Sequence, residues 1–202
     1  MLTILASTSN TTIAATQVFQ EHNFAMEIPS NWHELKPPPP QVLAAMQSPD
    51  RLKTILIFAQ KFSEAEAPTV VRDMMAGSKQ RAIDQGWQVT NERTTSIDGV
   101  PFNVVLTRVN TNSTMVTYFG IAGNDGYWLS GYHSSGNADS DDELISSIKS
   151  FRLLTRRSIP VAQIQPVSDA YGAGYFFGRL LMLALVGVAI LWVVRHFMGK
   201  KR

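Results

Sequence analysis

Cysteine is absent from the 202-residue sequence, and its absence excludes three kinds of site at once. A disulfide framework, a thiolate-bound metal and a cysteine nucleophile all require that side chain. The four histidines form neither an H-E-x-x-H motif nor a His-x-His pair, so they do not replace the missing thiolates as metal ligands. We therefore predict neither a metal site nor a bound cofactor.

The motifs of common catalysts are also missing. The chain has no G-x-S-x-G elbow and no G-x-x-x-x-G-K-S/T phosphate loop. His133 is the one histidine next to hydroxyls, those of Ser134 and Ser135. A nucleophilic pair needs a serine about 3 Å from the imidazole and an orienting acid, which neighbours in sequence seldom provide. The sequence thus predicts that the protein is not an enzyme and has no catalytic residues.

Positive charge is scarce in the first three quarters of the chain. Residues 1–154 hold eleven lysines and arginines against fifteen aspartates and glutamates, whereas residues 155–202 hold seven basic residues against one aspartate. A nucleic-acid-binding domain needs a basic face that neutralises phosphates, so we expect no nucleic-acid partner. The basic residues flank an apolar segment instead, where anionic lipid head groups attract them.

This apolar segment predicts a membrane anchor. Leu180–Val194 is fifteen residues long without a charge, and Tyr171–Gly178 extends it beyond Arg179. The 24 residues together make a helix of roughly 36 Å, enough for a hydrocarbon layer of about 30 Å. We predict a transmembrane helix over residues 171–195, after a linker at 155–170 and before a basic tail at 196–202. The alternative is a buried helix of the soluble domain, although such helices usually keep a polar face.

The residues assigned to the anchor differ in role. Arg179 lies near one edge, from which its guanidinium extends toward the head groups. Gly174 and Gly178 form a G-x-x-x-G pair, a pattern that lets two membrane helices approach closely, and they predict a homodimer through this helix. The other anchor positions are apolar, interfacial or basic: Phe176, Phe177, Leu180, Leu183, Val186, Ile190, Trp192, Val194, Arg195, Lys200, Lys201 and Arg202.

The other end of the chain bears on which side of the membrane the domain occupies. Residues 1–20 contain no charged side chain and no apolar run of seven, so the two characteristic regions of a secretory signal are missing. We expect a single-pass, tail-anchored protein whose domain stays in the cytosol. The alternative is that the start is misassigned and residues 12–15 end a removed signal, which places the domain outside.

The pattern of the remaining residues predicts an α+β domain at 22–154, after a flexible N-terminus at 1–21. One helix has Pro68 in its first turn and runs to about Gln85, with Gly86 as its stop, and a second buries Leu144, Ile148 and Phe151. The predicted fold is an antiparallel sheet flanked by these two helices, an α-β-α sandwich. Alternating or β-branched runs place the strands at Phe24–Ile28, Trp32–Leu35, Leu52–Phe62, Gln88–Thr95, Val100–Asn110, Thr114–Ala122 and Tyr127–His133.

An acidic run introduces the second helix. Ser140 and Glu143 have the spacing of a capping box, in which each side chain satisfies the other residue's amide. The run also contains Asp139, Asp141 and Asp142, but it lacks the spacing of a calcium-binding loop. Negative charge at a helix start complements the helix dipole, so we predict capping rather than calcium binding.

Three aromatic residues are candidate contacts for a protein partner: Trp32, Trp128 and Tyr132. Aromatic side chains dominate binding hot spots. Because successive residues of a strand point to opposite faces, the alternative for each ring is core packing.

Three segments carry a resemblance to a known family. Phe24–Trp32 (FAMEIPSNW), Ile97–Pro101 (IDGVP) and Ile145–Phe151 (ISSIKSF) are similar to PsbP-like and DcrB-related bacterial domains. The resemblance covers about residues 22–154. It implies an α-β-α sandwich that serves as a binding or assembly module rather than as an enzyme. Such domains more often carry an N-terminal lipoprotein or export signal, whereas the anchor predicted here is C-terminal.

Together these observations predict a single-pass membrane-anchored, non-enzymatic binding or assembly module. Its expected partners are the lipid bilayer and a membrane-associated protein that the sequence does not identify. The alternative is a small-molecule or lipid-binding domain with a pocket between helix and sheet. A closed apolar cavity of several hundred Å³ favours that pocket, whereas a flat exposed aromatic patch favours a protein partner.

Overall fold

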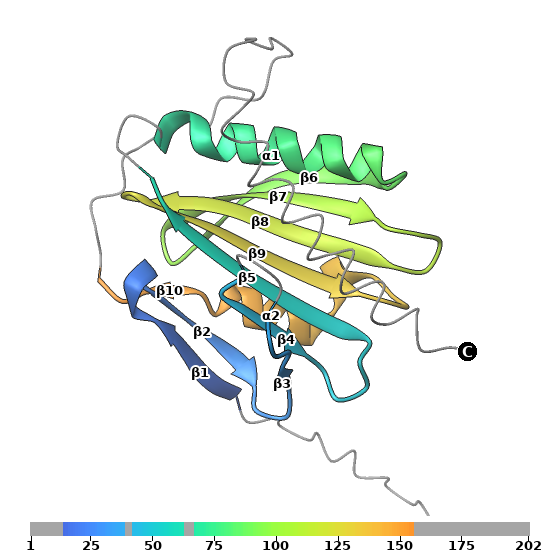
Figure 1. The fold of residues 1–202 in the computed structure, drawn as a ribbon, viewed down its shortest axis with the longest axis horizontal. Helices are drawn as coiled ribbons and strands as arrows, with labels where there is room; N and C mark the ends of the chain where they lie inside the picture. Colours follow the sequence, from blue (N-terminus) through green and yellow to red (C-terminus); the bar gives the residue numbers. More distant parts are fainter. Residues whose placement is uncertain (1–13, 39–41, 63–66, 156–202) are drawn as a thin grey trace, which may run out of the picture.

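The computed structural model describes residues 14–38, 42–62 and 67–155, which form two sheets and two α-helices (Figure 1). Seven antiparallel strands make the main sheet, in the order β3-β4-β5-β9-β8-β7-β6. Their bounds are His33–Glu34 (β3), Ala44–Gln47 (β4), Lys53–Lys61 (β5), Gln88–Ile97 (β6), Val100–Arg108 (β7), Thr114–Ala122 (β8) and Asp125–His133 (β9). The small sheet has the order β1-β2-β10, formed by Ala14–Phe19, Phe24–Pro29 and Arg152–Leu153.

The two helices cover opposite faces of the main sheet (Figure 1). α1 (Ala67–Asp84) packs over β6, β7 and β8, and its Met74 and Met75 are buried against the sheet. α2 (Asp142–Lys149) lies on the other face together with the small sheet, where Leu144 and Ile148 are fully buried. The predicted α+β fold with two helices is therefore observed, and the small sheet is an additional part of the α2 layer.

Five aromatic rings hold the α2 layer on the main sheet. Phe151, which follows α2, is 2% exposed. Its ring centroid lies 5.4 Å from that of Phe24 in β2, 5.3 Å from that of Phe102 in β7 and 5.0 Å from that of Tyr127 in β9. Phe19 of β1 extends this aromatic cluster by stacking on Phe24, with the ring centroids 4.6 Å apart. Offset and edge-to-face pairs of this kind contribute about 0.5–1.5 kcal/mol each beyond area burial.

Most of the predicted strands are found close to their predicted positions, but three were missed: β1, β4 and the two-residue β10. β8 has the predicted bounds, and β5 is an interior strand with β4 and β9 as neighbours. β4 is rich in alanine, which has little strand propensity, yet Ala45 is completely buried because tertiary packing at this site favours a small side chain. β1 lies inside the segment that was predicted to be flexible at residues 1–21, and it is stabilised by pairing along its whole length with β2.

The start of α2 differs from the predicted capping box. A 3-10 turn at Ala138–Ser140 shifts the N-cap to Asp141, whose carboxylate accepts a hydrogen bond from the amide of Leu144 at 3.0 Å. The hydroxyl of Ser140 turns back to the carbonyl of Asn137 at 3.4 Å. Glu143 pairs with Lys53 instead of with an amide of the cap. The predicted N-cap, Ser140, was therefore wrong by one position, and Asp141 of the acidic run caps the helix instead.

The predicted linker begins at Thr155, which is the last described residue. The rest of the linker, the predicted membrane helix and the basic tail, residues 156–202, lie outside the described residues. In the part of the chain that the structure describes, no helix is both long enough and apolar enough to cross a bilayer.

Gly120 tests how tightly the α2 layer is packed. A Cβ built at Gly120 of β8 would lie 2.6 Å from Cε1 of the buried Phe102 ring. Two non-bonded carbon atoms do not approach this closely. We expect Gly120→Ala to lower the free energy of unfolding by about 1–3 kcal/mol, measured by urea unfolding. Gly131→Ala is the matched control, because its Cβ would meet Ile148 at 3.3 Å, and its loss should be smaller. Equal losses for the two variants would contradict this account.

Candidate functional site

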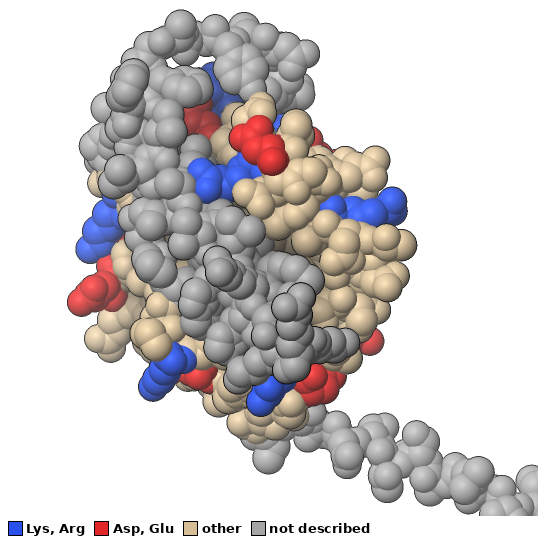
Figure 2. All heavy atoms as spheres, turned by 45° about the vertical axis from the view of Figure 1, so that its right-hand side comes forward, with Lys and Arg blue, Asp and Glu red and all other residues tan. Residues whose placement is uncertain are grey.

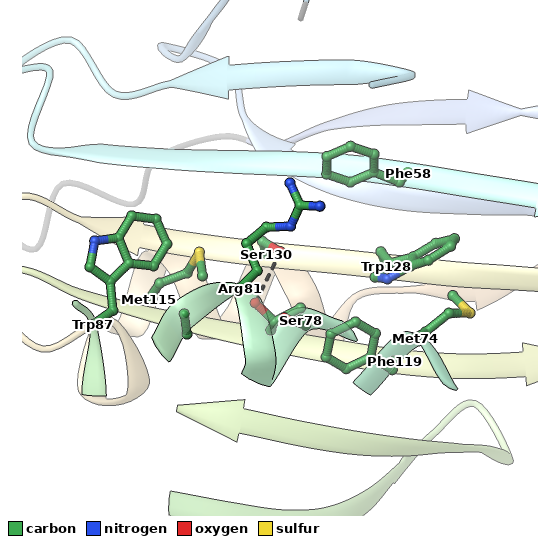
Figure 3. Close-up of a pocket in the computed structure, with 11 residues that line it drawn as sticks. Phe58, Met74, Ser78, Arg81, Trp87, Met115, Phe119, Trp128 and Ser130 are labelled. Carbon is green, nitrogen blue, oxygen red and sulfur yellow. Dashed lines mark hydrogen bonds between the residues drawn. The ribbon is translucent and has the colours of Figure 1, made fainter. Parts of the chain in front are cut away.

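The space between α1 and the main sheet is the candidate for a ligand pocket (Figure 3). It contains a cavity of about 20 Å³. The side chains that line it come from α1, from the residue that precedes β6, and from β5, β8 and β9: Phe58, Met74, Ser78, Arg81, Ala82, Trp87, Met115, Thr117, Phe119, Trp128 and Ser130.

Strand pairing arranges the floor of this cavity in rows. Phe58 of β5 lies opposite Trp128 of β9, which lies opposite Phe119 of β8. The ring centroids of neighbours in this row are 6.4 Å apart. Two residues further along, Ser130 lies opposite Thr117. Because side chains two apart share a face, the aromatic row and the hydroxyl row both point toward α1.

The polar groups of the cavity are few. The hydroxyls of Thr117 and Ser130 form a hydrogen bond of 3.1 Å, and both residues are buried. Arg81 extends from α1 toward the strand that carries Phe58 (Figure 3). Burial lowers the pKa of the Arg81 guanidinium below its ordinary value, and the charge of Asp84 on the same helix opposes this shift.

The volume of the cavity limits which molecules can occupy it. About 20 Å³ is enough for one water molecule, which needs roughly 10–15 Å³ by the same measure. A small organic ligand usually occupies about 300–1,000 Å³. As described, the cavity accommodates a water molecule beside the two hydroxyls, and a larger ligand would require α1 or its side chains to move.

A second cluster of polar side chains lies on the opposite face of the main sheet, where α2 begins. The Nζ of Lys53 is 3.0 Å from Oδ2 of Asp141 and 2.6 Å from Oε2 of Glu143. Burial by itself lowers the pKa of Lys53, but the hydrogen bonds to Glu143 and Asp141 outweigh burial and raise the pKa above its ordinary value. Lysine therefore keeps its charge here and ties the start of α2 to the start of β5.

His133 belongs to the same cluster of polar side chains, and both of its ring nitrogens face groups of the domain. Its Nδ1 accepts a hydrogen bond from the amide of Ser135 at 3.2 Å, which leaves the proton on Nε2. Nε2 lies 3.6 Å from Oδ2 of Asp141. The ring thus bridges the β9 loop and the cap of α2. Among the described residues, no three histidines, aspartates or glutamates converge into a group that could hold a metal ion.

The acidic run is paired with basic side chains on the main sheet. Asp139 forms an ion pair with Arg93 of β6, and Asp141 and Glu143 share Lys53. Figure 2 shows acidic and basic side chains mixed over the face that it displays, without a continuous patch of one sign among the described residues there.

The last described residues are held by a hydrogen-bonded clamp. The amide of Leu153 donates to Oδ2 of Asp98 at 2.8 Å, and the amide of Leu154 donates to the carbonyl of Asn23 at 3.0 Å. The amide of Thr155 donates to Oδ1 of Asn23 at 3.0 Å, and Nδ2 of Asn23 donates to the carbonyl of Thr155 at 2.9 Å. We call these four bonds the exit clamp.

The exit clamp depends on two residues with left-handed backbone. Asn23 has φ 58° and Asp98 has φ 50°, a region that asparagine and aspartate tolerate better than other residues with a Cβ. Asn23 ends the turn before β2 and Asp98 opens the turn after β6, and their side chains bond to Thr155 and Leu153. The clamp therefore fixes the position of Leu153 to Thr155 on the domain.

The three aromatic residues predicted to contact a partner do not form a shared exposed patch. Trp32 is 6% exposed and belongs to the core on the α2 side. Trp128 is 7% exposed and lines the cavity under α1, and Tyr132 is partly buried against the same core. Their alternative assignment, core packing, is the observed one for the two tryptophans. Strand alternation turns Trp128 of β9 toward the face under α1, and Trp32, which lies between β2 and β3, is buried in the core on the α2 side.

Sequence reasoning missed three residues that the structure brings to these sites. Arg81 has a detectable signal, since it lies three positions after Ser78 and seven after Met74, on one helix face. Asn23 and Asp98 have a weaker signal, because each is a turn residue whose distant partner appears only in the fold.

Comparison with known proteins identifies a similar fold. The solution structure of cyanobacterial PsbP (CyanoP) from Synechocystis sp. PCC 6803 matches with a TM-score of 0.51 and 12% identity, over 74% of this chain and 97% of that chain. A crystal structure from Bacteroides thetaiotaomicron VPI-5482 has a TM-score of 0.45 and 16% identity, over 65% of this chain and 45% of that chain. A scan against protein-family models and a search of curated proteins give no match. The likeness to CyanoP confirms a PsbP-like fold.

Asn23→Gly separates the side-chain part of the exit clamp from the backbone conformation, because glycine adopts the same φ without strain. We expect this variant to lower the free energy of unfolding by about 1–2 kcal/mol, as two hydrogen bonds to Thr155 are lost. Amide exchange at Thr155 should accelerate. Exchange at Leu153, which is bonded to Asp98, is the internal control, and equal acceleration at both amides would contradict a local clamp.

Proposed function

We propose that this protein is a single-pass membrane-anchored, non-enzymatic binding or assembly module for a membrane-associated protein partner. The observation that carries the proposal is the uncharged run Leu180–Val194, extended by Tyr171–Gly178 and followed by Arg195, Lys200, Lys201 and Arg202. Its length and flanking charges are typical of a membrane helix with a basic end. The domain then acts within reach of the bilayer.

The exit clamp supports an anchored role for the domain. Its four hydrogen bonds fall on three consecutive residues, Leu153 to Thr155. The first and last residues of most domains are poorly ordered unless bonds to the domain hold them. Here the domain fixes the point from which the linker at 155–170 would lead to the anchor, which suits a module that is held near a membrane.

The described interior supports binding through the surface rather than chemistry or ligand storage. The cavity under α1 holds about 20 Å³, and the ring of His133 is engaged by the amide of Ser135 and faces Asp141. The same proposal includes a relation to DcrB-like domains, beyond the PsbP-like fold. It also includes a cytosolic position of the domain.

Membrane fractionation tests the anchor in the full chain. We expect the Leu183→Arg, Val186→Arg, Ile190→Arg variant to move from the carbonate-resistant membrane fraction to the soluble fraction, since each arginine costs about 2.5–3.5 kcal/mol in the middle of a membrane helix. The matched control replaces the same residues by other apolar ones, Leu183→Ile, Val186→Leu and Ile190→Val, and should stay in the membrane. A triple-arginine variant that remains carbonate-resistant would overturn the anchor.

Protease treatment of intact cells then tests the side of the membrane. A cytosolic domain should be cleaved only after permeabilisation, whereas cleavage in intact cells would place the domain outside and contradict the tail-anchored part of the proposal.

A second candidate function is a small-molecule or lipid-binding domain that uses the space under α1. One observation favours it: a guanidinium, that of Arg81, lies beside a lining of aromatic and methionine side chains, a combination that suits an apolar ligand with an anionic end. Native mass spectrometry of the purified full chain distinguishes the two candidates. A stoichiometric bound small molecule that is lost in Met74→Trp, which fills the cavity, would favour this second function, and a ligand-free chain would oppose it.

A further inference from the structure

The edge strands of the two sheets differ in how well they are protected against pairing with other chains. β3, at one edge of the main sheet, has only two residues. β6, at the other edge, is interrupted by a register shift between Val89 and Asn91, and it carries Glu92 and Arg93, which pair with Lys79 and Asp139. Short strands, bulges and charges are the devices by which edge strands avoid pairing with other chains.

β1 has none of these devices. It is six residues long, AATQVF, without a charged side chain or a proline, and it pairs with β2 in unbroken register. Among the described strands, β2 is its one partner. Ala14, Ala15 and Thr16 are exposed, and Val18 keeps 51% of its surface exposed. Figure 1 shows β1 at the outer side of the small sheet.

We propose that β1 pairs antiparallel with β1 of a second copy of this chain. The alternation of the strand restricts the register of such a pair. Ala15, Gln17 and Phe19 lie opposite the buried Ile28, Met26 and Phe24, so they belong to the inner face of the small sheet. Two identical strands keep inner faces together when odd-numbered residues face odd-numbered ones.

A two-fold axis at Gln17 satisfies this condition. Gln17 then faces its own equivalent, and two amide side chains can exchange a hydrogen bond. The exposed Val18 faces Thr16 of the other copy, and Phe19 faces Ala15. No like charges are brought together, because β1 has no charged residue. The self-complementary pattern favours a second copy over a strand of unrelated sequence.

The predicted anchor is compatible with this arrangement. The linker at residues 155–170 has sixteen residues and reaches up to roughly 50 Å when extended, whereas a six-residue strand is about 20 Å long. Two copies can therefore pair along β1 while both are tethered to one membrane. The pairing does not require the anchor, and it is tested by a different measurement.

Disulfide cross-linking of the full chain tests the edge directly, because the native sequence has no cysteine. Residues directly opposite in an antiparallel pair have Cα atoms about 4.5–5.5 Å apart, within the range of a disulfide. We expect Gln17→Cys to form a covalent dimer under mild oxidation. The matched control is Thr94→Cys, at an exposed position of the protected edge strand β6, and it should remain monomeric.

A charge-repulsion variant separates specific pairing from chance encounter. Adding Thr16→Lys and Val18→Lys to Gln17→Cys places like charges opposite each other, and we expect the cross-linked fraction to fall about fivefold or more. Both substituted side chains are exposed, so circular dichroism and the unfolding midpoint should not change. A cross-linked fraction that does not fall would overturn the proposal.

Three other results would also overturn it. Equal cross-linking of Thr94→Cys would indicate unspecific contact. Loss of the Gln17→Cys dimer on adding Gly174→Leu and Gly178→Leu would show that the predicted membrane helix, rather than β1, brings the copies together. A Gln17→Cys monomer that dimerises only after removal of residues 2–12 would assign the edge to the chain's own N-terminal segment.

Discussion

Phe151 connects all the layers on one side of the main sheet. It follows α2 directly, and its ring packs against rings from β2, β7 and β9. Because these contacts fix the end of α2, the next two residues pair with β2 as β10, and the chain arrives at Asn23 and Asp98. The position of the exit clamp is therefore a consequence of one buried aromatic side chain.

The two faces of the main sheet are built differently although they belong to the same strands. The face under α2 and the small sheet buries aliphatic and aromatic side chains from many elements. The face under α1 places a row of rings beside the hydroxyls of Thr117 and Ser130, with Arg81 nearby. Strand alternation separates these two sets completely. The second face is thus the one where two hydroxyls and a guanidinium border a small cavity under a helix.

The fold could be predicted from the sequence wherever the local pattern agreed with the tertiary environment. β5, β8, β9 and both helices have strong periodicity or clear terminal residues, and they were found. β1 and β4 are rich in alanine and become strands only through their partners, so no local signal was available. The N-cap was displaced by one residue because a 3-10 turn precedes the helix. Trp32 and Trp128 were left with two interpretations, partner contact or core packing, since the sequence alone does not tell which surfaces of the sheets are covered; both are buried.

The geometry of the exit clamp also determines how this end of the domain responds to a pulling force. Its bonds lie on consecutive residues at the end of β10, which runs antiparallel to β2. A force that pulls Thr155 along the direction of the strand loads these bonds and the β10–β2 pairing at the same time, in shear, whereas a sideways force would open them one after another. A domain tethered by this end would therefore resist tension best when the linker continues the line of β10.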